Sequence, residues 1–142
     1  DQSSMAKLLV QGRDARRVLN RLGTADVDVA PGRVVYTQWL NARGGIEADL
    51  TVTRLDAQRF LVVTSVSSHV RDAAWLQRHI GPDDFCTVTD VTPGLPMLGL
   101  MGPRSRELLR QMVWTPGTQP ALENLGGAEA LMETARNELA KE

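Results

Sequence analysis

Residues 33–55 read RVVYTQWLNARGGIEADLTVTRL, and this stretch decides the fold. Two runs rich in β-branched and aromatic residues, Arg33–Asn41 and Ile46–Leu55, flank a turn that contains Gly44 and Gly45. Such runs on either side of a short glycine-containing turn predict a β-hairpin, because glycine adopts the backbone angles that tight turns require. We therefore expect an antiparallel sheet at the centre of the domain.

The pairing within this hairpin depends on where the turn is centred. A turn centred on Ala42 and Arg43 aligns residues whose numbers sum to 85, so that Tyr36 lies directly opposite Asp49. Glu47 then lies one step along the same face, about 7 Å from Asp49 between α-carbons. The face expected to enter the core collects Val35, Thr37, Trp39, Ile46, Ala48, Leu50 and Val52. The opposite face collects Tyr36, Gln38, Glu47, Asp49 and Thr51.

Further elements are expected on both sides of the hairpin. β-Propensity predicts strands at Met5–Gln11, Phe60–Thr64, Cys86–Val91 and Pro96–Met101. Helical spacing of apolar residues predicts helices at Ala15–Leu22, at Val70–Ile80 with Ser67 or Ser68 as its cap, and at Arg104–Val113 with Pro103 at its first position. The resulting order, β-α-β-β-β-α-β-β-α, predicts an α+β fold: an antiparallel sheet with helices on one face, ferredoxin-like.

The chain is expected to leave the domain after the third helix and to continue as a linker and a separate helix. Residues 1–113 form the predicted domain, residues 114–127 a linker that contains two prolines, and residues 128–142 a C-terminal helix with one apolar face. That helix would dock on the sheet or on another chain.

Composition limits the kind of protein that this chain can be. At 142 residues with 42% hydrophobic content, it is long enough for one ordinary domain. Sixteen Lys and Arg residues against 17 Asp and Glu residues provide no broad basic surface, so we expect no nucleic-acid partner. The single cysteine, Cys86, predicts no disulfide. With neither an apolar span nor a signal-peptide pattern at Asp1, we expect a cytoplasmic protein with no membrane partner.

The polar face of the hairpin supports two interpretations. A carboxylate such as Asp49 beside an aromatic ring such as Tyr36 suits an amine-containing heterocycle, because the ring stacks while the carboxylate accepts an N–H or a proton. Alternatively, this is the solvated face of a half-buried sheet, since antiparallel strands commonly alternate apolar and polar residues.

The amino-acid sequence of the hairpin resembles that of a known family. Val35–Asn41 with Gly44–Leu55 is similar to the folate-binding domain of the glycine cleavage aminomethyltransferase, and closest to the version in flavin-dependent dimethylglycine and sarcosine dehydrogenases and oxidases. Further matching segments are Asp1–Lys7, Gln11–Ala15 and Leu98–Ser105. The resemblance extends from Asp1 to about Met112.

This resemblance implies a function and a site. In the family, a tetrahydrofolate amine captures a one-carbon unit from an amine donor, next to an Asp on the strand after the Gly-Gly turn. By motif, Asp49 is the implied catalytic and folate-binding residue, and Tyr36 the implied folate-binding residue on the preceding strand. The implied partners are folate, a flavin domain or a second copy of the chain.

Family members are longer, and Thr115–Glu142 has no counterpart of the segment that completes their folate pocket. We therefore expect the chain to be incomplete as an enzyme on its own. The alternative is a non-catalytic, truncated domain that acts as a binding or self-assembly module.

Other motifs in the sequence point less specifically to a functional site. Ser4 and Lys7 match a Ser-x-x-Lys pattern whose companion motifs are missing. His69 and His79 lie on different faces of one predicted helix, so no metal site is expected there. Gly44-Gly45 lacks the Lys and Ser/Thr of a phosphate-binding loop. Four arginines make the first helix basic, typical of a solvated face, although a folate polyglutamate tail or a neighbouring chain would also suit it.

Overall fold

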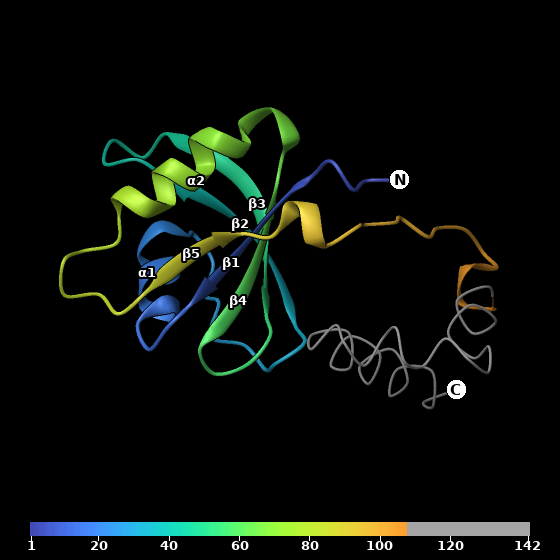
Figure 1. The fold of residues 1–142 in the computed structure, drawn as a ribbon, viewed down its shortest axis with the longest axis horizontal. Coiled ribbons are helices and arrows are strands. Elements are labelled where there is room, and N and C mark those ends of the chain that lie inside the picture. The colour runs from blue at the N-terminus through green and yellow to red at the C-terminus, as the bar shows by residue number, and fades with distance from the viewer. Residues whose placement is uncertain (108–142) are drawn as a thin grey trace. The chain divides into compact units, whose positions relative to one another are not determined.

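The computed structural model describes residues 1–107 of the chain. Its first compact unit, Asp1–Met97, contains a five-stranded sheet (Figure 1). The strands are β1 (Ala6–Gln11), β2 (Val34–Leu40), β3 (Ile46–Arg54), β4 (Arg59–Thr64) and β5 (Thr87–Asp90). The helices are α1 (Ala15–Leu22) and α2 (His69–Arg78), with short 3-10 turns η1 (Val66–Ser68) and η2 (Thr92–Gly94). Residues 98–107 belong to a second unit.

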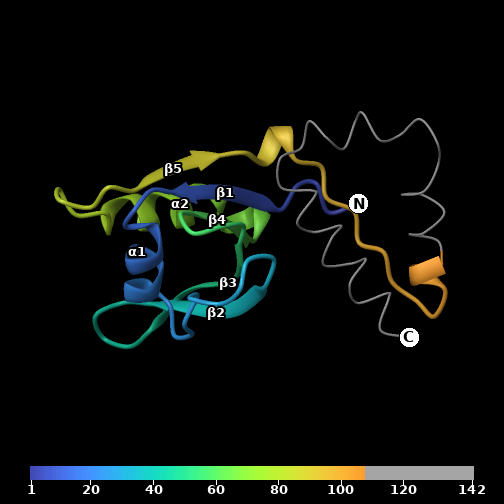
Figure 2. The same ribbon diagram turned by 90° about the horizontal axis from the view of Figure 1, so that it is seen from below.

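Every neighbouring pair of strands is antiparallel, in the order β2-β3-β4-β1-β5. Both helices pack on the same face, because buried residues of α1 and Leu76 of α2 join one core with Leu8, Phe60 and Val62 of the sheet. Figure 2 shows α1 between the two ends of the twisted sheet, where it contacts β2 and β4. The expected α+β class, an antiparallel sheet with helices on one face, is confirmed; the ferredoxin-like assignment stays a prediction.

The register of the hairpin differs from the expected one by two residues. Paired residues sum to 87, so that Asp49 faces Gln38 and Tyr36 faces Thr51. The turn is centred one position later because Gly44 adopts φ +79° there, and the Asn41 side chain accepts hydrogen bonds from the backbone N–H groups of Arg43 and Gly45. A shift of two residues keeps the side chains of Val34–Trp39 and Ala48–Thr53 on their predicted faces.

Ile46 was expected in the core, and this is wrong. Its exposed fraction is 68%, whereas Trp39, Ala48 and Leu50 on the same predicted face are buried. A bulge between Trp39 and Leu40 shifts the last pair to Leu40 with Ile46. Bulges bend the strand and end regular pairing, so Ile46 lies at the end of the hairpin outside the covered part of the sheet.

Two other expectations need correction. Pro96–Met101 is not a strand, because Met97 bonds to the N-terminal segment instead: Gln2 N–H donates to its carbonyl, and its own N–H donates to Ser3 Oγ. Pro103 lies in a turn before a helical stretch that begins at residue 105, so it is not the first helical residue. The linker 114–127 and the helix 128–142 lie outside the described residues.

The cap of α2 is in the expected place but uses different bonds. Ser68 occupies the N-cap position, yet its side chain makes no capping hydrogen bond and instead donates to Asp72 Oδ2 at 2.6 Å. The serine that caps a backbone N–H is Ser65, which accepts from Ser67 N–H at the start of η1.

Candidate functional site

Asp49 and Tyr36 lie on the sheet face opposite the two helices, here called the outer face. Because the core face takes the even-numbered residues of β3 and the odd-numbered residues of β2, alternation directs Asp49 and Tyr36 outward. Both side chains are exposed, and 63% of Tyr36 is accessible to solvent. The structure therefore presents the two predicted site residues on one accessible surface.

The two residues are joined by a hydrogen bond. The Tyr36 hydroxyl donates to Asp49 Oδ2 at 2.6 Å, although the residues are diagonal neighbours in the ladder. Gln38, directly opposite Asp49, donates from its amide to the other oxygen, Oδ1, at 3.2 Å. Gln38 is itself oriented by Thr24, whose hydroxyl donates to Oε1 at 3.2 Å. The carboxylate is therefore fixed through both oxygens, and sequence reasoning did not find the part played by Gln38 because the assumed register paired Asp49 with Tyr36.

The contact also changes the ionisation of the phenol. The hydrogen bond to Asp49 is the main cause that raises the pKa of Tyr36 above its ordinary value, with smaller contributions from desolvation and from the negative charge of Asp49. A carboxylate offers about four lone-pair sites. Because Asp49 has two bonded neighbours, it keeps the capacity to accept further N–H groups from a ligand.

We predict that Asp49→Asn lowers the pKa of Tyr36 toward its ordinary value. The neutral amide removes the negative charge that opposes the phenolate, its NH2 group can donate to the phenolate oxygen, and its carbonyl oxygen is a weaker acceptor for the phenol than a carboxylate. Tyr36 is the only tyrosine of the chain, so the ultraviolet absorbance of phenolate during a pH titration reports this residue alone. The exposed Asp83, changed to Asn, is the control and should leave the titration unchanged. Identical titrations for Asp49→Asn and the parent protein would refute the hydrogen bond.

Glu47, the second carboxylate of the predicted face, is engaged by the end of the hairpin. Asn41 Nδ2 donates to its Oε1 at 2.7 Å, and Arg71 of α2 donates to its backbone carbonyl at 2.8 Å. The structure thus gives Glu47 a role in tying the hairpin to α2, and Asp49 remains the accessible carboxylate beside Tyr36.

The basic surface of α1 is paired with acidic residues. The pairs are Arg13 with Asp14, Arg16 with Asp28, and Arg17 and Arg21 with Asp84. Only 4% of the Asp84 side chain is exposed, and hydrogen bonds from Arg21 and from the Gly81 N–H lower its pKa. Arg17 and Arg21 therefore hold α1 against the loop that precedes β5.

The two histidines are separated, as expected. His69 Nε2 lies 3.0 Å from Asp90 Oδ2, and His79 Nδ1 lies 2.7 Å from the carbonyl oxygen of Trp75. Within residues 1–107, no group of three or more His, Cys, Asp and Glu residues is arranged to hold a metal ion.

Among the same residues, no helix has the length and apolar character needed to cross a membrane.

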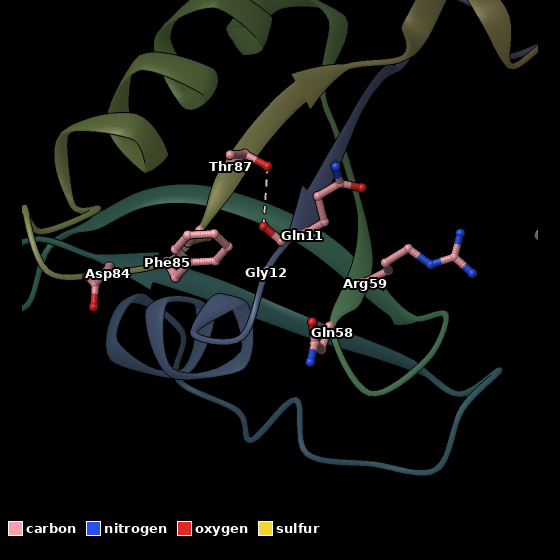
Figure 3. A pocket seen from close by; sticks show the side chains of 8 residues that line it. Gln11, Gly12, Gln58, Arg59, Asp84, Phe85 and Thr87 are labelled. Atoms are coloured by element: carbon pink, nitrogen blue, oxygen red, sulfur yellow. Dashed lines mark hydrogen bonds between the residues drawn. The ribbon is translucent and has the colours of Figure 1, made fainter.

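A separate hollow of about 570 Å³ lies where β1 ends (Figure 3). Gln11, Gln58 and the exposed ring of Phe85 line it. Cys86 also borders it, and burial raises the pKa of its thiol. Gln11 is the last residue of β1, whereas Asp49 aligns with the start of that strand when the ladder register is continued. The hollow and the candidate site are therefore at opposite ends of the sheet.

Two buried charged residues were not predicted to be buried: Lys7 was named only in the Ser-x-x-Lys pattern, and Asp72 was not named from the sequence. Lys7 of β1 is 3% exposed and Asp72 of α2 is 1% exposed. A lysine inside the apolar run Ala6–Val10 is the available signal for the first, and the Ser68-to-Asp72 spacing of one helical turn is a weak signal for the second.

Fold and hairpin together define an α+β domain whose outer sheet face carries an oriented, accessible carboxylate. The chain belongs to the aminomethyltransferase family, since residues 1–132 match the profile of the GCVT N-terminal domain.

Individual proteins are similar to this chain in the same way. The 4-methylaminobutanoate oxidase (formaldehyde-forming) of Paenarthrobacter nicotinovorans is 46% identical over 112 residues, which cover 79% of this chain and 14% of that protein. An aminomethyltransferase of Prosthecochloris aestuarii is 36% identical over 118 residues, covering 82% and 32%. The crystal structure of the glycine cleavage system aminomethyltransferase T from Bartonella henselae superposes with a TM-score of 0.68 at 26% identity, covering 82% and 31%. The chain thus spans at most 32% of these proteins.

Proposed function

We propose that the outer face of the hairpin binds tetrahydrofolate and that Asp49 assists the transfer of a one-carbon unit from an amine donor to it. The observation that carries this proposal is the accessible Asp49 carboxylate, fixed at 2.6 Å from the Tyr36 hydroxyl and 3.2 Å from the Gln38 amide. The aminomethyltransferase family is folate-dependent, which supports the same ligand for this chain.

The residues present fit a reduced pterin. Asp49 has acceptor capacity for ligand N–H groups, and the exposed ring of Tyr36 offers an apolar surface beside it. Tetrahydrofolate supplies a secondary amine that takes up the one-carbon unit. Asp49 orients that amine by accepting its N–H, stabilises the positive charge that develops on nitrogen, and accepts the proton when the new C–N bond forms. Gln38 and Tyr36 keep the carboxylate in one orientation throughout.

The name of one relative supports a class of donor. The name 4-methylaminobutanoate oxidase (formaldehyde-forming) describes an N-methylated amine as the substrate and formaldehyde as a product of that relative. We place the donor for this chain in the same class, with a flavin-containing domain or subunit as the source of the oxidised carbon and with self-association as the alternative arrangement.

The sheet order also supports a ferredoxin-like origin. Without the edge strand β2, the elements follow the β-α-β-β-α-β order of that motif, and the strands lie in the order β3-β4-β1-β5. Strand β2, which contributes Tyr36 and Gln38, would then be an addition that carries half of the candidate site.

Isothermal titration of the 142-residue chain with tetrahydrofolate tests the proposal. We expect saturable binding that Asp49→Asn weakens by about tenfold to a hundredfold, because a hydrogen bond to a charged group contributes about 1.5–3 kcal/mol. The exposed Asp83, changed to Asn, should leave the affinity unchanged. Absence of binding at millimolar tetrahydrofolate would reject the proposal for this chain and leave the binding or self-assembly module.

A further inference from the structure

Lys7 is a buried cation that bonds to backbone carbonyls. Its exposed fraction is 3%, and its ammonium donates to two backbone carbonyls, those of Ser3 at 3.0 Å and Met5 at 2.8 Å. No carboxylate pairs with it among residues 1–107. Burying a charge that no opposite charge compensates costs stability, so a hydrophobic residue at this position would be the simpler solution for folding alone.

Lys7 shares the outer face with the candidate site. In the ladder Lys7 faces Val63, Val63 faces Thr51, and Thr51 faces Tyr36, and directly paired residues project from the same face of a sheet. The Lys7 side chain therefore projects from the face that carries Asp49.

The carbonyls that Lys7 binds lie level with Asp49. Ala6 pairs with Thr64 and Thr51 with Val63, so the continued register aligns Met5, Ser65 and Asp49 in one row across β1, β4 and β3. The segment Ser3–Met5 therefore lies at the end of β1 that corresponds to the start of β3, where Asp49 lies.

Other hydrogen bonds also hold this segment: Ser3 N–H donates to Asp1 Oδ1 at 2.9 Å, and the Ser3 hydroxyl donates to the Met97 carbonyl at 3.4 Å. Gln2 N–H donates to the Met97 carbonyl at 2.8 Å, Met5 N–H donates to the Gln2 carbonyl at 3.0 Å, and Ser3 Oγ accepts from Met97 N–H at 3.0 Å. Among residues 1–107, only the Lys7 ammonium bonds the carbonyls of both Ser3 and Met5, and it does so from β1, an interior strand of the sheet.

We infer that Lys7 is a positioning residue, whose buried ammonium holds Ser3–Met5 as the wall of the ligand site that faces Asp49. The inference rests on the proposed function for the identity of the ligand. It explains why β1, in which Ala6 and Leu8–Val10 are apolar, keeps a cation under the segment rather than a methionine or leucine.

The first test is independent of folate. In Lys7→Met, a chain of similar length without donors replaces the ammonium, and we expect the amide hydrogens of Gln2, Met5 and Met97 to exchange at least about tenfold faster, as measured by NMR. The midpoint of thermal unfolding should stay the same or rise, because an uncompensated buried charge is removed. Unchanged exchange rates at all of these amides would overturn the inference.

The second test measures affinity. Lys7→Met should weaken tetrahydrofolate binding about tenfold while the titration of Tyr36 stays as in the parent protein, because the hairpin half of the site is untouched. Lys7→Gln retains an amide donor, should recover part of the affinity, and serves as the second variant if Lys7→Met does not fold. Arg59→Met is the matched control: it removes a cation from the same sheet face, at the far end of β4 and paired with Asp56.

The outcomes separate the two proposals. If the parent protein binds tetrahydrofolate and Lys7→Met binds equally well, the positioning role is rejected and the proposed function stands. If the parent protein does not bind, the proposed function fails, and the exchange measurement alone decides whether Lys7 holds the segment. A loss of affinity that Arg59→Met reproduces would indicate a general effect of charge and would also reject the role of Lys7.

Discussion

Replacing Gly12 by alanine is expected to destabilise the domain by roughly 2–5 kcal/mol, through backbone strain and a steric clash together. Gly12 follows β1 and has φ +135°, a conformation that residues with a side chain rarely adopt. A Cβ atom there would lie 2.2 Å from the carbonyl oxygen of Phe85 and 2.9 Å from its carbonyl carbon. Both are backbone atoms, so no side-chain rotation relieves the overlap.

The Phe85 backbone has little freedom to move away. Its N–H donates to Asp14 Oδ2 at 2.9 Å, and its carbonyl accepts from Asp14 N–H at 3.2 Å. The hydrogen bond from the Phe85 N–H is also the main cause that lowers the pKa of Asp14. Relief of the clash would therefore break contacts that join the start of α1 to the segment before β5.

Chemical denaturation of Gly12→Ala measures this loss, and Gly44→Ala is its matched control. Gly44 also has a positive φ, +79°, but a Cβ there meets no atom within 4 Å. We expect Gly44→Ala to cost about 1 kcal/mol, the strain alone. Equal losses for the two variants would show that the contact with Phe85 contributes nothing.

The outline of the fold is predictable from local pattern. Helix α1 begins and ends at the predicted residues, because Ala15, Val18, Leu19 and Leu22 repeat at helical spacing and all enter the core. The strand pairs of the hairpin are likewise visible as two β-rich runs. Such signals need only the residues of one element and its nearest neighbours.

The errors arise where the periodicity of a segment does not determine how that segment pairs. The two-residue shift in the hairpin follows from Asn41, whose side chain closes the turn around Gly44, and from a bulge at Trp39. Pro96–Met101 has the composition of a strand, yet Met97 finds its backbone partners in the N-terminal segment. The periodicity of the two segments predicts neither the shifted register nor the backbone partners of Met97.

The candidate site was predictable in its residues and not in its geometry. The contact between Tyr36 and Asp49 is present, but as a diagonal pair, because a tyrosine side chain is long enough to reach the neighbouring row. Gln38 holds the directly opposite position that the sequence assigned to Tyr36. Lys7 was named only as part of the Ser-x-x-Lys pattern, because its burial, which makes its charge unusual, is a property of the folded chain.

Replacing Asp72 by alanine is expected to cost roughly 2–4 kcal/mol of folding free energy, because it removes a buried acceptor that two hydroxyl donors share. The Asp72 carboxylate is 1% exposed and accepts from the hydroxyls of Thr64 and Ser68, both at 2.6 Å. Arg71 adds an ion pair at 3.0 Å. One side chain thus joins the end of β4 to the first turn of α2.

Thermal unfolding of a double-mutant cycle measures this network. Thr64→Val removes a donor while keeping the shape of the side chain, so Asp72→Ala should cost at least about 1 kcal/mol less in that background. The exposed Asp83, changed to Ala, is the control and should stay within about 0.5 kcal/mol of the parent protein. An equal cost of Asp72→Ala in both backgrounds would contradict the predicted coupling.

The same network has a consequence for the candidate site. Arg71, oriented by Asp72, donates at 2.8 Å to the carbonyl of Glu47, which lies two residues before Asp49 on β3. Loss of Asp72 should therefore loosen α2 against the hairpin, while the bonds from Tyr36 and Gln38 to Asp49 persist because all three residues belong to the hairpin itself. In Asp72→Ala, held below its unfolding midpoint, the titration of Tyr36 should match that of the parent protein. A lowered pKa of Tyr36 in this variant would show that the orientation of Asp49 depends on α2 and not on the hairpin alone.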